Sequence, residues 1–96
     1  MPEFDEIKKK RQEIINIAAS HGAGNIRLFG SVARGESGPK SDVDLLINLS
    51  PGRSLLDMVA IKQDLEDYLG YEVHVVTEAS LSPYLREGIL REAASL

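Results

Sequence analysis

The chain has 96 residues, of which 43% are hydrophobic and 27% charged, and these values predict one ordinary globular domain over residues 1–96. The absence of cysteine excludes a disulfide framework, a thiolate nucleophile and a Cys-based zinc site, and the net charge of −4 argues against direct nucleic-acid binding. No apolar run approaches the roughly 18 residues that span a bilayer, and the charged N-terminus has no signal-peptide core, so we expect a cytoplasmic protein.

The first expected element is a helix from Phe4 to Ser20 that ends at His21-Gly22. Its apolar residues recur at helical spacing and predict one buried face, made by Phe4, Ile7, Ile14, Ile15 and Ala18. A short strand follows over Asn25–Phe29 and ends at Gly30-Ser31. Residues 32–35 then favour the start of a short helix, and residues 36–39 a loop.

The second half of the chain alternates strands and helices. Residues Asp42–Leu49 form a strand with one fully apolar face. Ser54, with Asp57 three residues later, predicts a capping box that opens a helix ending at Gly70. A third strand covers Glu72–Val76. Ser82-Pro83 favours the start of a last helix, whose predicted inner side carries Leu85, Ile89, Leu90 and Ala93.

The order α-β-α-β-α-β-α predicts an α/β (α+β) fold in which a small mixed sheet of at least three strands packs with helices. A helical crossover joins the second and third strands, so we expect them to be parallel. The first and second strands are joined by a shorter connection, and we expect them to be antiparallel.

Two features of the sequence point to phosphate chemistry. Gly30-Ser31 lies where a strand gives way to a helix start, so its backbone N–H groups and the Ser31 hydroxyl can face an anion. Asp42 and Asp44 are two apart on a strand, which places their carboxylates on one face, about 6.6 Å apart along the chain. Carboxylates so placed can share Mg²⁺, and a phosphate cradle beside them suits phosphoryl or nucleotidyl transfer.

Gly30-Ser31, ten intervening residues and then Asp42-Val43-Asp44 match the signature Gly-Ser-x10-Asp-x-Asp. The chain therefore resembles the polymerase-β-type nucleotidyltransferase superfamily. The fuller string GSVARGESGPKSDVDLLI resembles the minimal nucleotidyltransferases, many of which are antitoxins of HEPN/MNT toxin–antitoxin modules. The resemblance implies the polymerase-β-type nucleotidyltransferase fold over nearly the whole chain.

The resemblance also implies roles for individual residues. Gly30 and Ser31 bind the triphosphate of ATP, Arg34 assists at a phosphate or at the acceptor, and Asp42 and Asp44 ligate Mg²⁺. The implied partner is a HEPN-type toxin, and the implied reaction moves AMP from ATP to a toxin tyrosine.

One residue departs from the superfamily pattern. The next core strand usually supplies a third acidic residue, and here the string Glu72-Val73-His74-Val75-Val76 places His74 at that position. By strand alternation His74 points to the same side as Glu72, toward the active face, and a neutral imidazole can ligate metal or accept a proton. Two alternatives stay open: a catalytic role for His74, or a slow or inactive protein that neutralises its toxin by binding alone.

Overall fold

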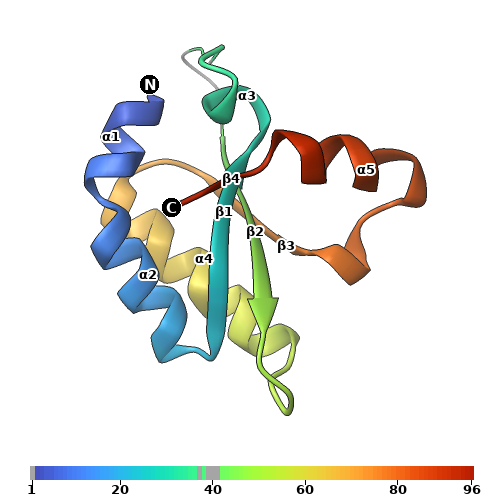
Figure 1. Ribbon diagram of the computed structural model, residues 1–96. Helices are drawn as coiled ribbons and strands as arrows, with labels where there is room; N and C mark the ends of the chain where they lie inside the picture. The colour runs from blue at the N-terminus through green and yellow to red at the C-terminus, as the bar shows by residue number, and fades with distance from the viewer. Residues whose placement is uncertain (1, 37, 39–41) are drawn as a thin grey trace.

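The structure is a computed structural model that describes residues 2–36, 38 and 42–96. A four-stranded sheet in the order β3-β2-β1-β4 forms its centre (Figure 1). The strands are β1 (Ala23–Phe29), β2 (Val43–Leu49), β3 (Val73–Thr77) and β4 (Ala94–Ser95). β1 runs antiparallel to β2 and β4, whereas β2 and β3 are parallel. The predicted mixed sheet and both predicted strand orientations are thus confirmed.

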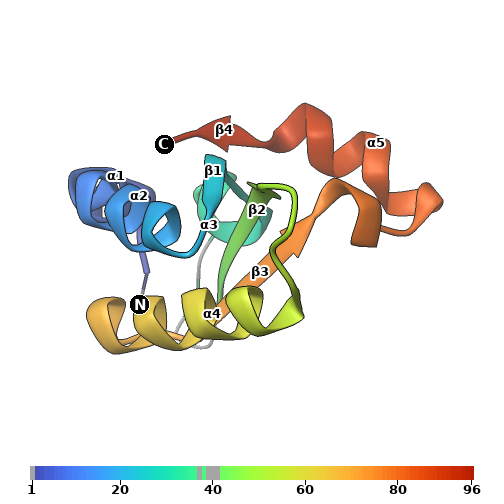
Figure 2. The same ribbon diagram turned by 90° about the horizontal axis from the view of Figure 1, so that it is seen from below.

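The helices are distributed unequally over the two sides of the sheet. The elements are α1 (Phe4–Lys9), α2 (Arg11–Ser20), α3 (Gly30–Ala33), α4 (Leu55–Leu69), α5 (Pro83–Glu92) and the 3₁₀ turn η1 (Glu78–Ser80). Helices α1, α2 and α4 lie on one side, and α5 lies on the other side (Figures 1 and 2). Among the described residues, no helix is both long and apolar enough to cross a membrane.

The core lies between the sheet and the helices α1, α2 and α4. Strand β2 contributes the apolar face that its alternation predicts, since Val43, Leu45 and Ile47 are fully buried. Helix α2 contributes Ile14 and Ala18, as predicted. Burial of each of the larger side chains contributes about 1.5–3 kcal/mol to the free energy of folding. This face of the sheet therefore stabilises the fold, and the opposite face can carry functional residues.

The capping signals of the sequence are confirmed at α4 and α5. Ser54 accepts a hydrogen bond from Leu56 N–H while Asp57 accepts one from Ser54 N–H, and α4 ends at Gly70 with a φ of 79°. Left-handed backbone of this kind favours glycine. At α5, Ser82 caps the helix in front of Pro83.

Two expectations from the sequence were wrong, and one strand beyond the expected minimum of three was not predicted. The predicted helix Phe4–Ser20 is divided at Lys10, whose N–H is shared between the carbonyls of Glu6 and Ile7 and so tightens the turn. A fourth strand, β4, was not predicted. The predicted inner side of α5 is not buried, because this helix contacts α3 rather than the core, and Leu85 remains 61% exposed.

Candidate active site

The first turn of α3 lies directly against the side chain of Asp44. Gly30 begins α3 with a φ of 79°, and a Cβ atom added there would collide with Oδ2 of Asp44 and lie 3.1 Å from its Cγ. Glycine is therefore required at residue 30 both by backbone conformation and by space. Ser31 follows in the same turn and is half-buried. The predicted phosphate-binding turn and the predicted metal ligand are thus neighbours.

Strand pairing places Asp44 at the centre of the site. Asp44 pairs with Phe29 at the end of β1 on one side and with His74 of β3 on the other. Side chains of directly paired residues project to the same face of a sheet. Asp44 and His74 therefore share the face that α1, α2 and α4 leave uncovered.

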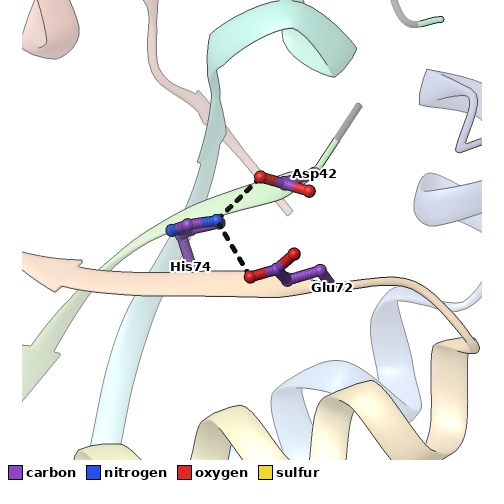
Figure 3. Close-up of side chains that lie close together, drawn as sticks. All are labelled: Asp42, Glu72 and His74. Carbon is purple, nitrogen blue, oxygen red and sulfur yellow. Dashed lines mark hydrogen bonds and ion pairs between the residues drawn. The ribbon is translucent and has the colours of Figure 1, made fainter. Parts of the chain in front are cut away.

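A cluster of three side chains forms where β2 and β3 begin (Figure 3). His74 Nε2 lies 2.8 Å from Asp42 Oδ2 and 3.8 Å from Glu72 Oε1. One ligand atom from each of Asp42, Glu72 and His74 can be chosen so that all three lie within 4.8 Å of one another. The predicted orientation of His74 toward Asp42 and Glu72 is confirmed.

A fourth carboxylate, that of Glu92, reaches the turn from the last residue of α5. Glu92 Oε2 accepts a hydrogen bond from Gly30 N–H at 2.8 Å, and Glu92 Oε1 accepts one from Arg34 Nη1 at 2.5 Å. Arg34 Nε also donates to Glu36 Oε2 at 3.1 Å. The Gly30 N–H that we expected to be free for an external anion is therefore bonded to the protein's own carboxylate.

The electrostatics of the site follow from this crowding. Burial raises the pKa of Asp44 above its usual value, and the negative charges of Asp42 and Glu92 raise it further, whereas His74 and Arg34 act in the opposite direction. For Glu92, burial raises the pKa, but the bonds from Arg34 and Gly30 outweigh it, so the net shift is downward. The site thus combines an ionised Glu92 with an Asp44 that resists ionisation.

The residues present fit a divalent cation. Carboxylate oxygens are the ligands that Mg²⁺ prefers, and Asp42 and Glu72 supply them in the cluster with His74. Asp44 lies outside that cluster but near enough to Asp42 for the two charges to interact. A cation there would relieve the unfavourable charge on Asp44. His74 adds a nitrogen ligand, which suits Mg²⁺ less well than oxygen does.

Sequence reasoning singled out most residues of the site and missed two of them. The structure brings together Gly30, Arg34, Asp44 and His74, with Asp42 bonded to His74. Glu92 was missed because it is 58 positions from Arg34 in the chain and ends a helix that resembled an ordinary amphipathic one. Glu72 was noted only as lying on the same side of its strand as His74, whereas both face Asp42.

Comparisons with known proteins identify the family. A family model described as "Nucleotidyltransferase domain" matches residues 5–96. The chain is 45% identical over 93 residues to "Putative protein adenylyltransferase MJ0435" of Methanocaldococcus jannaschii, which covers 97% of each chain. It is 35% identical over 89 residues to protein adenylyltransferase MntA of Thermococcus cleftensis, covering 84% of this chain and 90% of that protein.

Solved structures share the fold. One described as "putative minimal nucleotidyltransferase" superimposes with a TM-score of 0.87 at 44% identity, over 99% of this chain and 97% of the other. A toxin–antitoxin structure with AMP-PNP gives a TM-score of 0.75 at 22% identity, over 88% and 69% of the two chains. A structure of a tri-AMPylated Shewanella oneidensis HEPN toxin in complex with MNT antitoxin gives a TM-score of 0.69 at 19% identity. The match covers 92% of this chain and 69% of the other. The last two show a likeness of fold alone.

Proposed function

The chain belongs to the nucleotidyltransferase domain family, and from that premise we propose that it transfers AMP from ATP to a protein acceptor in a reaction that depends on Mg²⁺. The observation that carries the proposal is the contact between the Gly30 turn and Asp44, which joins the two halves of the nucleotidyltransferase signature at one point. The names of relatives at 45% and 35% identity, both protein adenylyltransferases, support a protein as the acceptor.

Each residue of the site has a role in this proposal. The turn at Gly30-Ser31 and the guanidinium of Arg34 bind the triphosphate, since N–H, hydroxyl and guanidinium groups all donate to phosphate oxygens. Asp42 and Asp44 hold Mg²⁺, and Glu72 and His74 lie close enough to Asp42 to take part. The bound metal neutralises charge on the reacting phosphates.

The reaction balances with ATP and a hydroxyl acceptor alone. The acceptor oxygen forms a bond to the α-phosphorus of ATP, the bond from that phosphorus to the oxygen bridging to the β-phosphorus breaks, and pyrophosphate leaves. The hydroxyl proton is released. Because the protein forms no covalent intermediate in this scheme, its residues act by holding the phosphates in line and by compensating their charge.

We propose a HEPN-type toxin as the partner and one of its tyrosines as the acceptor, with the chain acting as antitoxin. Two structures of the same fold contain toxin–antitoxin complexes, and one of those toxins carries AMP.

A second candidate function is neutralisation of the toxin by binding alone, and the contact between His74 and Asp42 favours it. When its ring is charged, His74 forms an ion pair with Asp42 at 2.8 Å, and this pair competes with metal for the same carboxylate. The third carboxylate of the superfamily is also absent at this position. Both features reduce the rate expected of the enzyme without affecting a binding surface.

The test is co-expression of the chain with a HEPN-type toxin encoded beside it, followed by intact-mass measurement of the purified toxin after incubation with ATP and Mg²⁺. The proposal expects the toxin mass to increase by one or more AMP units, and peptide mapping to place them on tyrosine. The matched control is the Asp42→Asn/Asp44→Asn double variant, which should leave the toxin mass unchanged. A stable complex with no added AMP would instead establish the binding-only function.

A further inference from the structure

Glu92 connects the two groups that the proposed function assigns to the triphosphate, although it lies outside the nucleotidyltransferase signature. One oxygen of its carboxylate is bonded to Gly30 N–H and the other to Arg34 Nη1. The Glu92 side chain is only 23% exposed, whereas that of Glu36, the other carboxylate on Arg34, is 67% exposed. The more protected ion pair of Arg34 is therefore the one with Glu92.

The ion pair with Glu92 fixes the orientation of Arg34 and uses only part of the hydrogen-bonding capacity of the guanidinium. A guanidinium carries five N–H donors in a rigid plane, and the bonds to Glu92 and Glu36 use one donor on each of two nitrogens. Among the described residues the remaining donors have no partner, and they lie in the same plane. An arginine held in this way loses less rotamer entropy when it binds phosphate than one that moves freely in solvent.

We propose that Glu92 is a positioning residue for nucleotide binding: it holds Arg34 and the Gly30 turn in the arrangement in which they meet the triphosphate. This inference rests on the proposed function, because it takes Arg34 as a phosphate ligand. It adds α5 to the elements that build the site. Helix α5 contacts the nucleotide-binding turn through the bond between Glu92 and Gly30, and β4, which follows it, pairs with β1.

The opposite role for Glu92 is a block, in which its carboxylate occupies the place of a phosphate and must leave before ATP binds. The two roles predict effects of opposite sign. Removing a positioning residue weakens nucleotide binding, whereas removing a competing anion strengthens it. The location of Glu92 at the base of the turn, with low exposure and bonded to the N–H of the first residue of α3, favours positioning.

The experiment measures the affinity of the whole protein for α,β-methylene-ATP with Mg²⁺, an analogue that cannot release pyrophosphate, by calorimetric titration. Glu92→Ala should weaken binding roughly two- to tenfold, the range expected from freeing one long side chain. Glu92→Gln, whose amide oxygen can still accept from Gly30 N–H but has no charge for Arg34, should fall between wild type and Glu92→Ala. Glu87→Gln is the matched control, since Glu87 is exposed on the same helix and pairs with Arg91.

Arg34→Ala separates this inference from the proposed function. If Glu92 acts partly through Arg34, then Glu92→Ala should cost less affinity in the Arg34→Ala background than in the wild-type background, and the remaining loss is the share of the Gly30 contact. Tighter binding by Glu92→Ala, or equal losses in both backgrounds, would overturn the positioning role while leaving the nucleotide site in place. Failure of the wild-type protein to bind the analogue, or unchanged binding by Arg34→Ala, would count against the proposed function itself.

Discussion

Replacing Gly30 with alanine tests the close approach between the first turn of α3 and Asp44. The backbone at residue 30 has a φ of 79°, a conformation that costs an L-residue about 1–2 kcal/mol. The added methyl group would also collide with the Asp44 carboxylate, so either the turn or the strand residue must shift. Overpacking of this kind typically costs a further 1–3 kcal/mol or so.

Gly35→Ala separates the two contributions. Gly35 has a φ of 72°, and a Cβ atom added there meets no atom of the described residues within 4 Å, so this variant has the backbone cost without the collision. We expect Gly35→Ala to lower the free energy of unfolding by about 1–2 kcal/mol and Gly30→Ala by roughly 2–5 kcal/mol. Each kcal/mol corresponds to about 4–8 °C in Tm for a domain of this size.

The assay is urea denaturation followed by circular dichroism, applied to a double-mutant cycle with Asp44→Ala. Truncation of Asp44 removes the Oδ2 and Cγ atoms that the new methyl group would meet and leaves only the Cβ atom, at 3.3 Å. In the Asp44→Ala background, Gly30→Ala should therefore cost less than in the wild-type background and approach the cost of Gly35→Ala. The reasoning is refuted if Gly30→Ala and Gly35→Ala destabilise equally in the wild-type background, or if truncation of Asp44 leaves the cost of Gly30→Ala unchanged.

The same variant has a functional consequence. Because the collision displaces Asp44 or the turn, Gly30→Ala should weaken ATP binding in the presence of Mg²⁺ far more than Lys9→Ala, an exposed substitution on α1. Titration calorimetry on folded protein measures both affinities. Equal affinities of the two variants would contradict the assignment of the Gly30 turn to the triphosphate.

Three other predictions concern the carboxylates, His74 and a helix cap. Asp44→Asn should raise the stability of the metal-free protein at neutral pH, because the raised pKa of Asp44 means that folding disfavours its charge. That gain should begin to shrink in denaturation curves as the pH falls through the raised folded-state pKa, where the wild-type carboxyl protonates, and should vanish below the unfolded-state pKa. His74→Asp should increase Mg²⁺ affinity in calorimetric titration relative to His74→Ala, since an oxygen ligand replaces nitrogen beside Asp42. Ser54→Ala should lower the free energy of unfolding by about 0.5–2 kcal/mol and leave AMP transfer unchanged, because it removes only the cap of α4.

Local sequence signals predicted the parts of the fold whose causes are local. Helix α4 begins after Ser54 and ends at Gly70. A side-chain acceptor at the start and a left-handed residue at the end satisfy the free backbone N–H and C=O groups of a helix in any tertiary context. The alternation along β2 predicted which residues face the core, since Val43 and Leu45 project to one side of the strand. The connections between the strands predicted their relative directions. The short connection between β1 and β2 predicted an antiparallel pair, and the helical crossover between β2 and β3 predicted a parallel pair.

Elements that depend on tertiary context were not predictable in the same way. Strand β4 has two residues, Ala94 and Ser95, and exists because they pair with Leu28 and Arg27 of β1. No periodicity can be read from so short a segment. The exposed side of α5 was mispredicted because apolar spacing identifies a face of the helix but not the surface, if any, that covers it.

The same distinction applies to the site. Asp44 and His74 lie on adjacent strands, and Asp42 directly precedes β2. Alternation and pairing determine which of these side chains share a face, so their grouping was predictable. Glu92 reaches Arg34 only through the placement of α5, which no local pattern specifies. Residues that complete a site from a separate element are therefore the ones that required the structure.

The distribution of charge over the two faces of the sheet explains why nucleotide and metal should bind together. Val43 and Leu45 are buried among the helices, so the opposite face of β2 is free to carry Asp44 at little expense to the core. The positive charge of Arg34 is already paired with Glu92, and it does little to offset the carboxylates around it. A triphosphate brings further negative charge to the same place, and bare ATP is therefore repelled. A divalent cation on the carboxylates reverses this repulsion, so ATP affinity should increase steeply with Mg²⁺ concentration.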